Sequence, residues 1–346
     1  MKKCLSVFLI AVLILGTVII LPFSASAASN MVFDLAFGVT QSGHTEKYSI
    51  NAYKFTLNAY TTLTIDYDSY EPDMISGNYG DSYKGCLFVI KSSDYNNLLI
   101  GKSYTTYFKG YVSKGNNKRT WYDGNMSLYA GSYYLIIVPY DDSIGISSIW
   151  VRGSNDYTLS VTPTVSKLKS LSAVTSTGAV KLQWKGDLSA GGYQIQRKSN
   201  SYQTIANTSS TSYTDKSRKP GTVYTYRVRG YTTVGGKKYY GPWSNYSAVT
   251  LPATPTIKNP SANAKHQISA NWVKVNPCTG YQVQFSLNQK FSSLTTTKTF
   301  AGQNATRYTI TGKKEKVYYI RIRAYKKAGG KYYYSAWSKT KSVRCK

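Results

Sequence analysis

The chain offers little that is built for bond-making chemistry. It contains no Gly-x-Ser-x-Gly, no His-Glu-x-x-His, no glycine-rich phosphate loop and no EF-hand loop. Cys86 with His44 would be a conceivable nucleophile and base. Because Cys86 directly precedes the apolar run Leu87–Ile90, a core cysteine entering a buried strand explains it more simply. We therefore predict no catalytic residue, no cofactor and no enzymatic activity.

One cluster of acids has oxygen ligands at alternate positions, as a calcium site would need. It comprises Asp66, Asp68, Glu71 and Asp73. A solvated strand face followed by a turn accounts for the same four residues, and we prefer that interpretation. Weak Ca²⁺ binding there stays the alternative.

A larger set of residues suits anion binding. Arginine forks and lysine ammonium groups match phosphate or carboxylate, and tyrosine rings match sugars or bases. The glutamines at 194, 196, 282 and 284 are expected on the same outward face. The alternative is a solvated sheet face whose tyrosines cover the edge of the core. The candidate ligand-binding residues are Arg227, Arg229, Lys237, Lys238, Tyr239, Arg321, Arg323, Lys326, Lys327 and Lys331.

Charge divides the chain into two parts. Residues 28–163 contain 10 Lys/Arg and 12 Asp/Glu, whereas residues 164–346 contain 31 Lys/Arg and only Asp187, Asp215 and Glu315 as acids. Such an excess should attract polyanions, and salt should weaken the attraction over a Debye length of about 8 Å. Solubility alone is the competing explanation.

The basic part contains an internal repeat. The segment Val223–Tyr231 matches Val317–Tyr325 at a spacing of 94 residues, and both are followed by Gly-Gly, paired tyrosines and Trp-Ser. Upstream, Trp184 matches Trp272 at a spacing of 88. A period near 90 residues fits a complete small domain rather than a solenoid unit.

Each copy has the pattern of antiparallel strands. Val180, Leu182 and Trp184 alternate with polar residues, which is the period of a half-buried strand. The Gly-Gly pairs predict two-residue type I′ hairpins, since those turns need positive φ at both central residues.

These residues resemble a fibronectin type III domain. In the first copy the resemblance is carried by Trp184, Tyr193, Pro220–Tyr224, Arg227–Arg229 and Trp243-Ser244. In the second copy it is carried by Trp272, Tyr281, Tyr318 and Trp337. The second copy lacks the Pro-Gly-Thr segment that precedes Val223 in the first. The resemblance implies a tyrosine corner at Tyr224 and one at Tyr318. The amino-acid sequence of the two copies is also similar to repeats in secreted surface proteins of Gram-positive anaerobic bacteria.

The preceding part has a different strand pattern. Residues 53–57, 63–67, 128–138 and 157–161 have strand patterns. This part is similar to the jelly-roll module of the bacterial pre-peptidase C-terminal type, a non-catalytic accessory of secreted peptidases. We predict an all-β protein with a jelly-roll-like β-sandwich at 31–163 and fibronectin type III-like domains at 165–252 and 253–346.

The first residues predict export. Lys2 and Lys3, an apolar run over 4–23 and Ala25-Ser26-Ala27 form a signal peptide at 1–27, with an uncleaved membrane anchor as the alternative. After cleavage Cys86, Cys278 and Cys345 remain. Cys278 and Cys345 should lie at opposite poles of one sandwich, so we expect free thiols.

Together these features predict a secreted or surface-held adhesion protein that is not an enzyme. Its partners would be anionic cell-wall polymers such as teichoic acid, acidic polysaccharides, mucin glycans or another surface protein. One alternative is a secreted hydrolase, or an accessory subunit, whose first domain carries an unfamiliar site. Another is a non-specific extracellular nucleic-acid binder.

Overall fold

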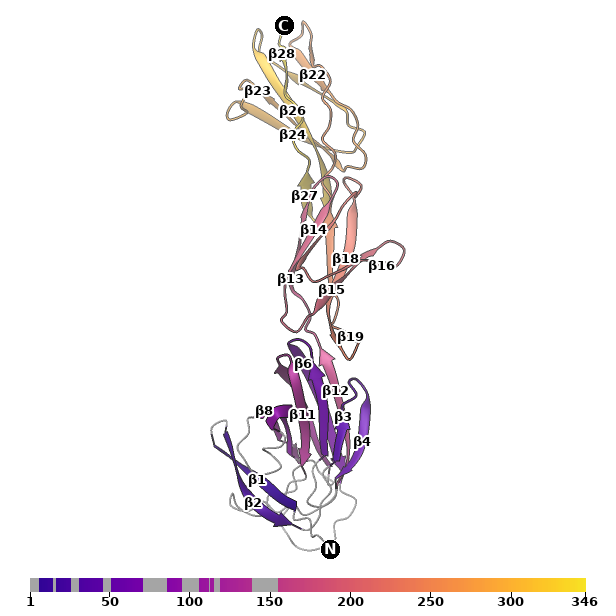
Figure 1. The fold of residues 1–346 in the computed structure, drawn as a ribbon. Helices are drawn as coiled ribbons and strands as arrows, with labels where there is room; N and C mark the ends of the chain where they lie inside the picture. The colour runs from indigo at the N-terminus through magenta and orange to yellow at the C-terminus, as the bar shows by residue number, and fades with distance from the viewer. Residues whose placement is uncertain are drawn as a thin grey trace. The chain divides into compact units, whose positions relative to one another are not determined.

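The computed structural model describes residues 6–14, 17–25, 31–45, 51–70, 86–94, 106–111, 113–114, 119–138 and 155–346. Within these ranges the elements are β-strands and one 3₁₀ turn, η1 (Ser92–Asp94), so the predicted all-β class is confirmed (Figure 1). None of the described segments forms a helix long and apolar enough to cross a membrane. The strands β1 (Ser6–Ile14) and β2 (Thr17–Ala25), within the predicted signal peptide, pair with each other.

The first sandwich has two five-stranded sheets. One sheet has the order β4-β12-β6-β10-β9, and the other β3-β5-β11-β7-β8. The strands are β3 (Met31–Asp34), β4 (Thr40–Thr45), β5 (Asn51–Leu57), β6 (Thr61–Tyr70), β7 (Cys86–Lys91), β8 (Thr106–Tyr111), β9 (Ser113–Lys114), β10 (Arg119–Leu128), β11 (Gly131–Val138) and β12 (Asn155–Thr164). Residues 128–138, which the pattern predicts as one strand, divide at 129–130, because the chain passes there from one sheet to the other.

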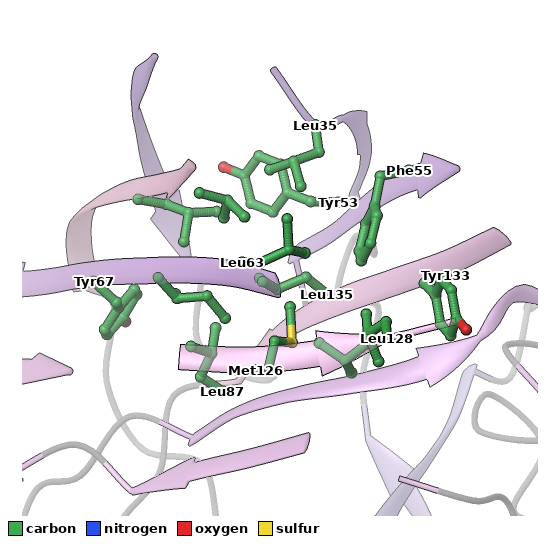
Figure 2. Close-up of a cluster of buried hydrophobic side chains, with 14 of the residues drawn as sticks. Leu35, Tyr53, Phe55, Leu63, Tyr67, Leu87, Met126, Leu128, Tyr133 and Leu135 are labelled. Carbon is green, nitrogen blue, oxygen red and sulfur yellow. The ribbon is translucent and has the colours of Figure 1, made fainter. Parts of the chain in front are cut away.

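Alternation along the strands builds the core of this sandwich. On β6, Leu63, Ile65 and Tyr67 are buried, whereas Asp66 between them is exposed. Figure 2 shows Leu63, Met126, Leu128 and Leu135 meeting between the sheets. Each buried leucine side chain contributes roughly 1.5–3 kcal/mol relative to its exposed state. The sheets are therefore held together by the inward residues of every second position.

The two copies of the repeat fold into sandwiches with the same strand order. In the first module, β13 (Lys169–Thr175), β14 (Val180–Lys185) and β17 (Ser212–Asp215) face a sheet of β15 (Gly192–Lys198), β16 (Tyr202–Thr208), β18 (Val223–Val234), β19 (Lys237–Tyr240) and β20 (Ser244–Val249). In the second module, β21 (Ser261–Ala262), β22 (Gln267–Asn271) and β25 (Arg307–Thr311) face β23 (Gly280–Ser286), β24 (Thr295–Ala301), β26 (Val317–Ala328), β27 (Lys331–Tyr334) and β28 (Lys341–Arg344). This is the expected fibronectin type III-like arrangement.

Both tyrosine corners are present. The backbone N–H of Lys219 donates to the Tyr224 hydroxyl at 2.8 Å, and that of Lys313 donates to the Tyr318 hydroxyl at 2.9 Å. The second corner therefore forms without the Pro-Gly-Thr lead of the first. Its backbone turn is instead made at Glu315, which has a φ of 61°.

Removing the second hydroxyl should have a modest and local effect. We expect Tyr318→Phe to lower the free energy of unfolding of its module by about 1 kcal/mol, the usual net value of one hydrogen bond. Amide hydrogen exchange of β26 and β28 measures the change. Protection that stays at the wild-type level would mean that the corner contributes no stability here.

The first module contains a buried ionic cluster. The Asp215 carboxylate, with 7% of its side chain exposed, accepts from Arg197 Nη1 at 2.7 Å and from the Tyr226 hydroxyl at 2.8 Å, and Arg218 Nε lies 3.4 Å away. Burial and this hydrogen bond raise the pKa of Tyr226. The second module has apolar residues here: Phe285 replaces Arg197, Ile320 replaces Tyr226, and Ile310 stands opposite Ile268 as Asp215 stands opposite Val180. The first module therefore has an ionic cluster at the positions where the second module has apolar side chains.

The chain divides into two compact units, and the end of the hairpin β18–β19, from Gly230 onward, belongs to the first. That unit comprises residues 1–166, 187–192 and 230–242, and the second comprises 167–186, 193–229 and 243–346. Within the first unit, Val234 is 4% exposed and belongs to the core of the first sandwich, and the Tyr239 hydroxyl donates to the Phe37 carbonyl at 2.9 Å. Both Gly-Gly hairpins have the predicted positive φ, 57° and 78° at Gly235-Gly236 and 53° and 77° at Gly329-Gly330.

The cysteines are thiols, as predicted, wherever their side chains are described. Cys278 and Cys345 are both buried and free. Burial raises the pKa of the Cys278 thiol, so this group is a weak nucleophile at neutral pH. Cys86 is the first residue of β7, as expected, and its side chain lies outside the described set.

Candidate functional site

The outward face of β18 carries a stack of arginine and aromatic side chains. Arg227 and Arg229 are two residues apart on the strand, so they share one face. Their guanidinium carbons lie 4.2 and 4.1 Å from the centroid of the Trp243 ring, and Arg227 also lies 4.1 Å from the Tyr202 ring. Their Nε atoms donate to Gln196 Oε1 at 2.7 Å and to Gln194 Oε1 at 2.9 Å. We call these six residues the first ladder: Gln194, Gln196, Tyr202, Arg227, Arg229 and Trp243.

The second module repeats this stack. Arg321 and Arg323 on β26 lie 4.6 and 4.5 Å from the Trp337 ring, and their Nε atoms each donate at 2.8 Å to Gln284 and Gln282. Phe291 lies over Arg321 at 4.0 Å, and Tyr334 lies over Arg323 at 3.7 Å. The second ladder is therefore Gln282, Gln284, Phe291, Arg321, Arg323, Tyr334 and Trp337.

Strand pairing explains how the ladders form. On β23, Gln282 is directly opposite Arg323 on β26, and Gln284 is directly opposite Arg321, so each arginine reaches a cross-strand partner. The glutamine amides are held in turn by threonine hydroxyls on the next strand, Thr299 at 3.2 Å and Thr297 at 3.0 Å. Each cation–π contact contributes roughly 0.5–2 kcal/mol. The arginines are thus fixed in place before any ligand arrives.

The second ladder holds positive charge without an acidic partner. Burial, and then the charge of Arg323, lower the pKa of Arg321, and burial lowers the pKa of Arg323. In the second module, which is described throughout, the ion pair joins Glu315 to Arg344. An added anion would therefore meet uncompensated charge at this face.

The predicted binding residues fall into three groups. The four arginines are in the ladders, as described above. Five lysines lie on or beside the hairpins: Lys237, Lys238, Lys327 and Lys331 are exposed and Lys326 is half-buried. Lys238 lies 4.3 Å from the Tyr231 ring, and Lys327 lies 5.4 Å from the Tyr332 ring. Tyr239 has its hydroxyl engaged by Phe37, so in this structure it is a packing residue of the first unit.

The two tryptophans of the ladders were missing from the predicted set. Trp243 and Trp337 each follow a Gly-Gly hairpin and precede a serine, so the repeat marks both. The repeated Trp-Ser pair indicates that both tryptophans matter, but a repeated tryptophan is equally typical of a core residue. Only the position of the rings beside the arginine face gives them their role.

The acidic cluster and the cysteine–histidine pair lie partly outside the residues whose side chains the structure describes. Asp66 is exposed on β6 and Asp68 is half-buried two residues on, whereas Glu71 and Asp73 lie outside the described residues. Within the described ranges no three His, Cys, Asp or Glu side chains gather as metal ligands. His44 lies on β4 and Cys86 on β7, which are strands of different sheets.

Comparison with known proteins returns structural likenesses alone. No family model matches the chain, and no curated protein matches it. A two-domain fibronectin type III segment of chicken tenascin shares 17% identity at a TM-score of 0.35, covering 51% of this chain and 98% of its own. The FN1–FN3 domains of chicken CNTN1 share 14% identity at a TM-score of 0.31, covering 75% of this chain and 91% of theirs. A protein named FN3tt shares 22% identity at a TM-score of 0.23, over 25% of this chain and 94% of its own.

Proposed function

We propose that this chain is a secreted or surface-held binding protein without catalytic activity, and that its two C-terminal modules attach it to anionic polymers. The proposed partners are cell-wall polymers and acidic glycans. The signal-peptide pattern of residues 1–27 supports export. The observation that most strongly supports this proposal is the positive charge of residues 164–346, which contain 31 Lys/Arg and three acidic residues. Two of those acids, Asp215 and Glu315, are already paired with arginines.

The arrangement of the cations supports this assignment. Exposed lysines at both Gly-Gly hairpins supply mobile point charges, and the ladders supply fixed guanidinium groups. A surface of this kind raises the local concentration of a polyanion and speeds its association. Another surface protein would need an acidic face to bind in the same way.

Binding should be salt-dependent. For the full chain and a teichoic acid probe we expect the affinity to fall at least about tenfold between 50 and 200 mM NaCl, because two displaced counterions suffice for that change. Biolayer interferometry at several salt concentrations gives the slope. No binding at 50 mM NaCl would refute the proposal, and preferential retention of double-stranded DNA would favour the nucleic-acid alternative over it.

A charge-matched pair of variants locates the interaction. Lys327→Gln with Lys331→Gln should reduce the salt slope and the affinity, because both lysines are exposed in the second module. Lys54→Gln with Lys91→Gln removes the same charge from the first sandwich, where both lysines are also exposed. Equal losses from the two double variants would show that overall charge alone, rather than the C-terminal modules, governs attachment.

A further inference from the structure

Given the polyanion binding proposed above, we infer that the second ladder is a two-point clamp for consecutive oxyanions of one linear polymer. The ligand class is a chain that carries phosphate or carboxylate on successive units, and not a neutral sugar stacked on the tryptophan. Three features of the ladders carry this assignment.

The first feature is the coverage of the rings. Trp337 has Arg321 and Arg323 within 4.6 Å of its centroid, and Trp243 has Arg227 and Arg229 within 4.2 Å. In each ladder the two arginines lie over the ring and are anchored to glutamines two residues apart. A sugar needs an open aromatic face to stack on, and in both ladders guanidinium groups lie over the tryptophan ring.

The second feature is the chemistry that remains exposed. The glutamine oxygens are used as acceptors by the arginine Nε atoms, and the glutamine amides donate to threonines. Within the described part of the chain, the Nη groups of Arg227, Arg321 and Arg323 have no protein acceptor. The half-buried arginines therefore present donors, which suits an oxyanion better than a hydroxyl-rich neutral ligand.

The third feature is spacing. Alternate residues of a strand are about 6.7 Å apart. Arg321 and Arg323 are alternate residues of β26, and their side chains are held by Gln284 and Gln282 on the neighbouring strand. Each planar fork is suited to bind one oxyanion through two parallel hydrogen bonds.

Replacing the glutamines by glutamates tests the clamp without dismantling it. In Gln282→Glu with Gln284→Glu, each carboxylate still accepts from the arginine Nε and now neutralises the guanidinium. Gln267→Glu with Gln289→Glu, at two exposed positions of the same module, changes the net charge equally and is the control. Near-ultraviolet circular dichroism of the tryptophans checks that the ladder remains assembled.

Affinities of the full chain for long-chain polyphosphate, poly-L-glutamate and neutral dextran are then compared at 50 mM NaCl. We expect the ladder variant to lose at least about tenfold for an anionic polymer, the control less than threefold, and dextran not to bind. Losses confined to one polymer identify the oxyanion. Equal losses in both variants, with wild-type binding intact, would overturn the clamp and leave the proposed function standing. Failure of the wild type to bind either polyanion would refute both.

A variant pair that keeps all charge gives an independent readout. Arg321→Lys with Arg323→Lys removes the bidentate fork but not the charge, and Arg307→Lys with Arg344→Lys is the matched change outside the ladder. We expect about a tenfold loss of affinity from the first pair and little from the second. Unchanged affinity in the ladder pair would mean that the site acts as unspecific charge, against the inference.

Discussion

Replacing Asp215 by asparagine should lower the free energy of unfolding of the first module by about 3 kcal/mol. The substitution keeps the shape of the side chain but leaves Arg197 and Arg218 without their carboxylate, and breaking one partner of a buried pair typically costs 3–5 kcal/mol. The lower end applies because the Arg197 side chain is 24% exposed. Amide hydrogen exchange of β14 and β17 reports the change for this module within the full chain.

Asp187→Asn is the matched control. It makes the same change of charge in the same module, where Asp187 accepts from the Ser189 N–H at 2.9 Å and from the Ser189 hydroxyl at 2.7 Å. Loss of this local turn contact should cost about 1 kcal/mol. If Asp187→Asn and Asp215→Asn are equally destabilising, the ionic cluster has no special weight.

The apolar residues of the second module suggest a triple variant that should restore the stability lost in Asp215→Asn. Arg197→Phe, Asp215→Ile and Tyr226→Ile together install the apolar residues that stand at Phe285, Ile310 and Ile320. Well-packed apolar residues of similar volume commonly replace a buried ion pair at no cost. We expect the triple variant to be at least 2 kcal/mol more stable than Asp215→Asn, and a triple variant less stable than the single one would contradict the equivalence of the two modules.

Truncating the core tryptophan of the second module should be the most destabilising single change. Trp272 is 2% exposed and contacts the Tyr281 ring edge-to-face at a centroid distance of 5.5 Å. Trp272→Ala should cost about 3–5 kcal/mol through lost burial and the remaining cavity. Hydrogen exchange should lose protection in β22, β23 and β26.

Two further variants make this prediction specific. Trp184→Ala removes the equivalent ring and should expose β14, β15 and β18 instead, so each truncation is the control for the other. Trp272→Phe should cost less than half as much, because it also removes an indole N–H that is buried without a hydrogen-bond partner in the described structure. If Trp272→Phe is as harmful as Trp272→Ala, packing shape rather than cavity volume decides the loss.

Local pattern predicted the strands well because alternation and turn chemistry act over a few residues. Val180, Leu182 and Trp184 are buried as expected, and the Gly-Gly turns have positive φ. The tyrosine corners followed from a family resemblance that carries long-range information. The break at 129–130 was missed, because a strand that changes sheet keeps its apolar alternation on both sides.

The candidate site was predictable in its residues but not in their contacts. The arginines could be placed on an outward face from the period of the strand alone. That Trp243 and Trp337 lie beside them depends on a return of the chain after the hairpin, which no local pattern contains. The pattern assigns Tyr239 to ligand binding because it lies with lysines on a Gly-Gly hairpin, yet its hydroxyl donates to the Phe37 carbonyl, 202 residues away.

The place of Val234 in the first core sets a limit on how this protein can be divided or recombined. A chain cut after residue 163 would lose a side chain that fills the interior of its only complete sandwich, and the new surface would be apolar. The corresponding positions of the other copy are Ala328 and Tyr333. Exchanging the two modules would therefore place a smaller residue in that space, so the order of the duplicated units affects the packing of the first core even though their folds are alike.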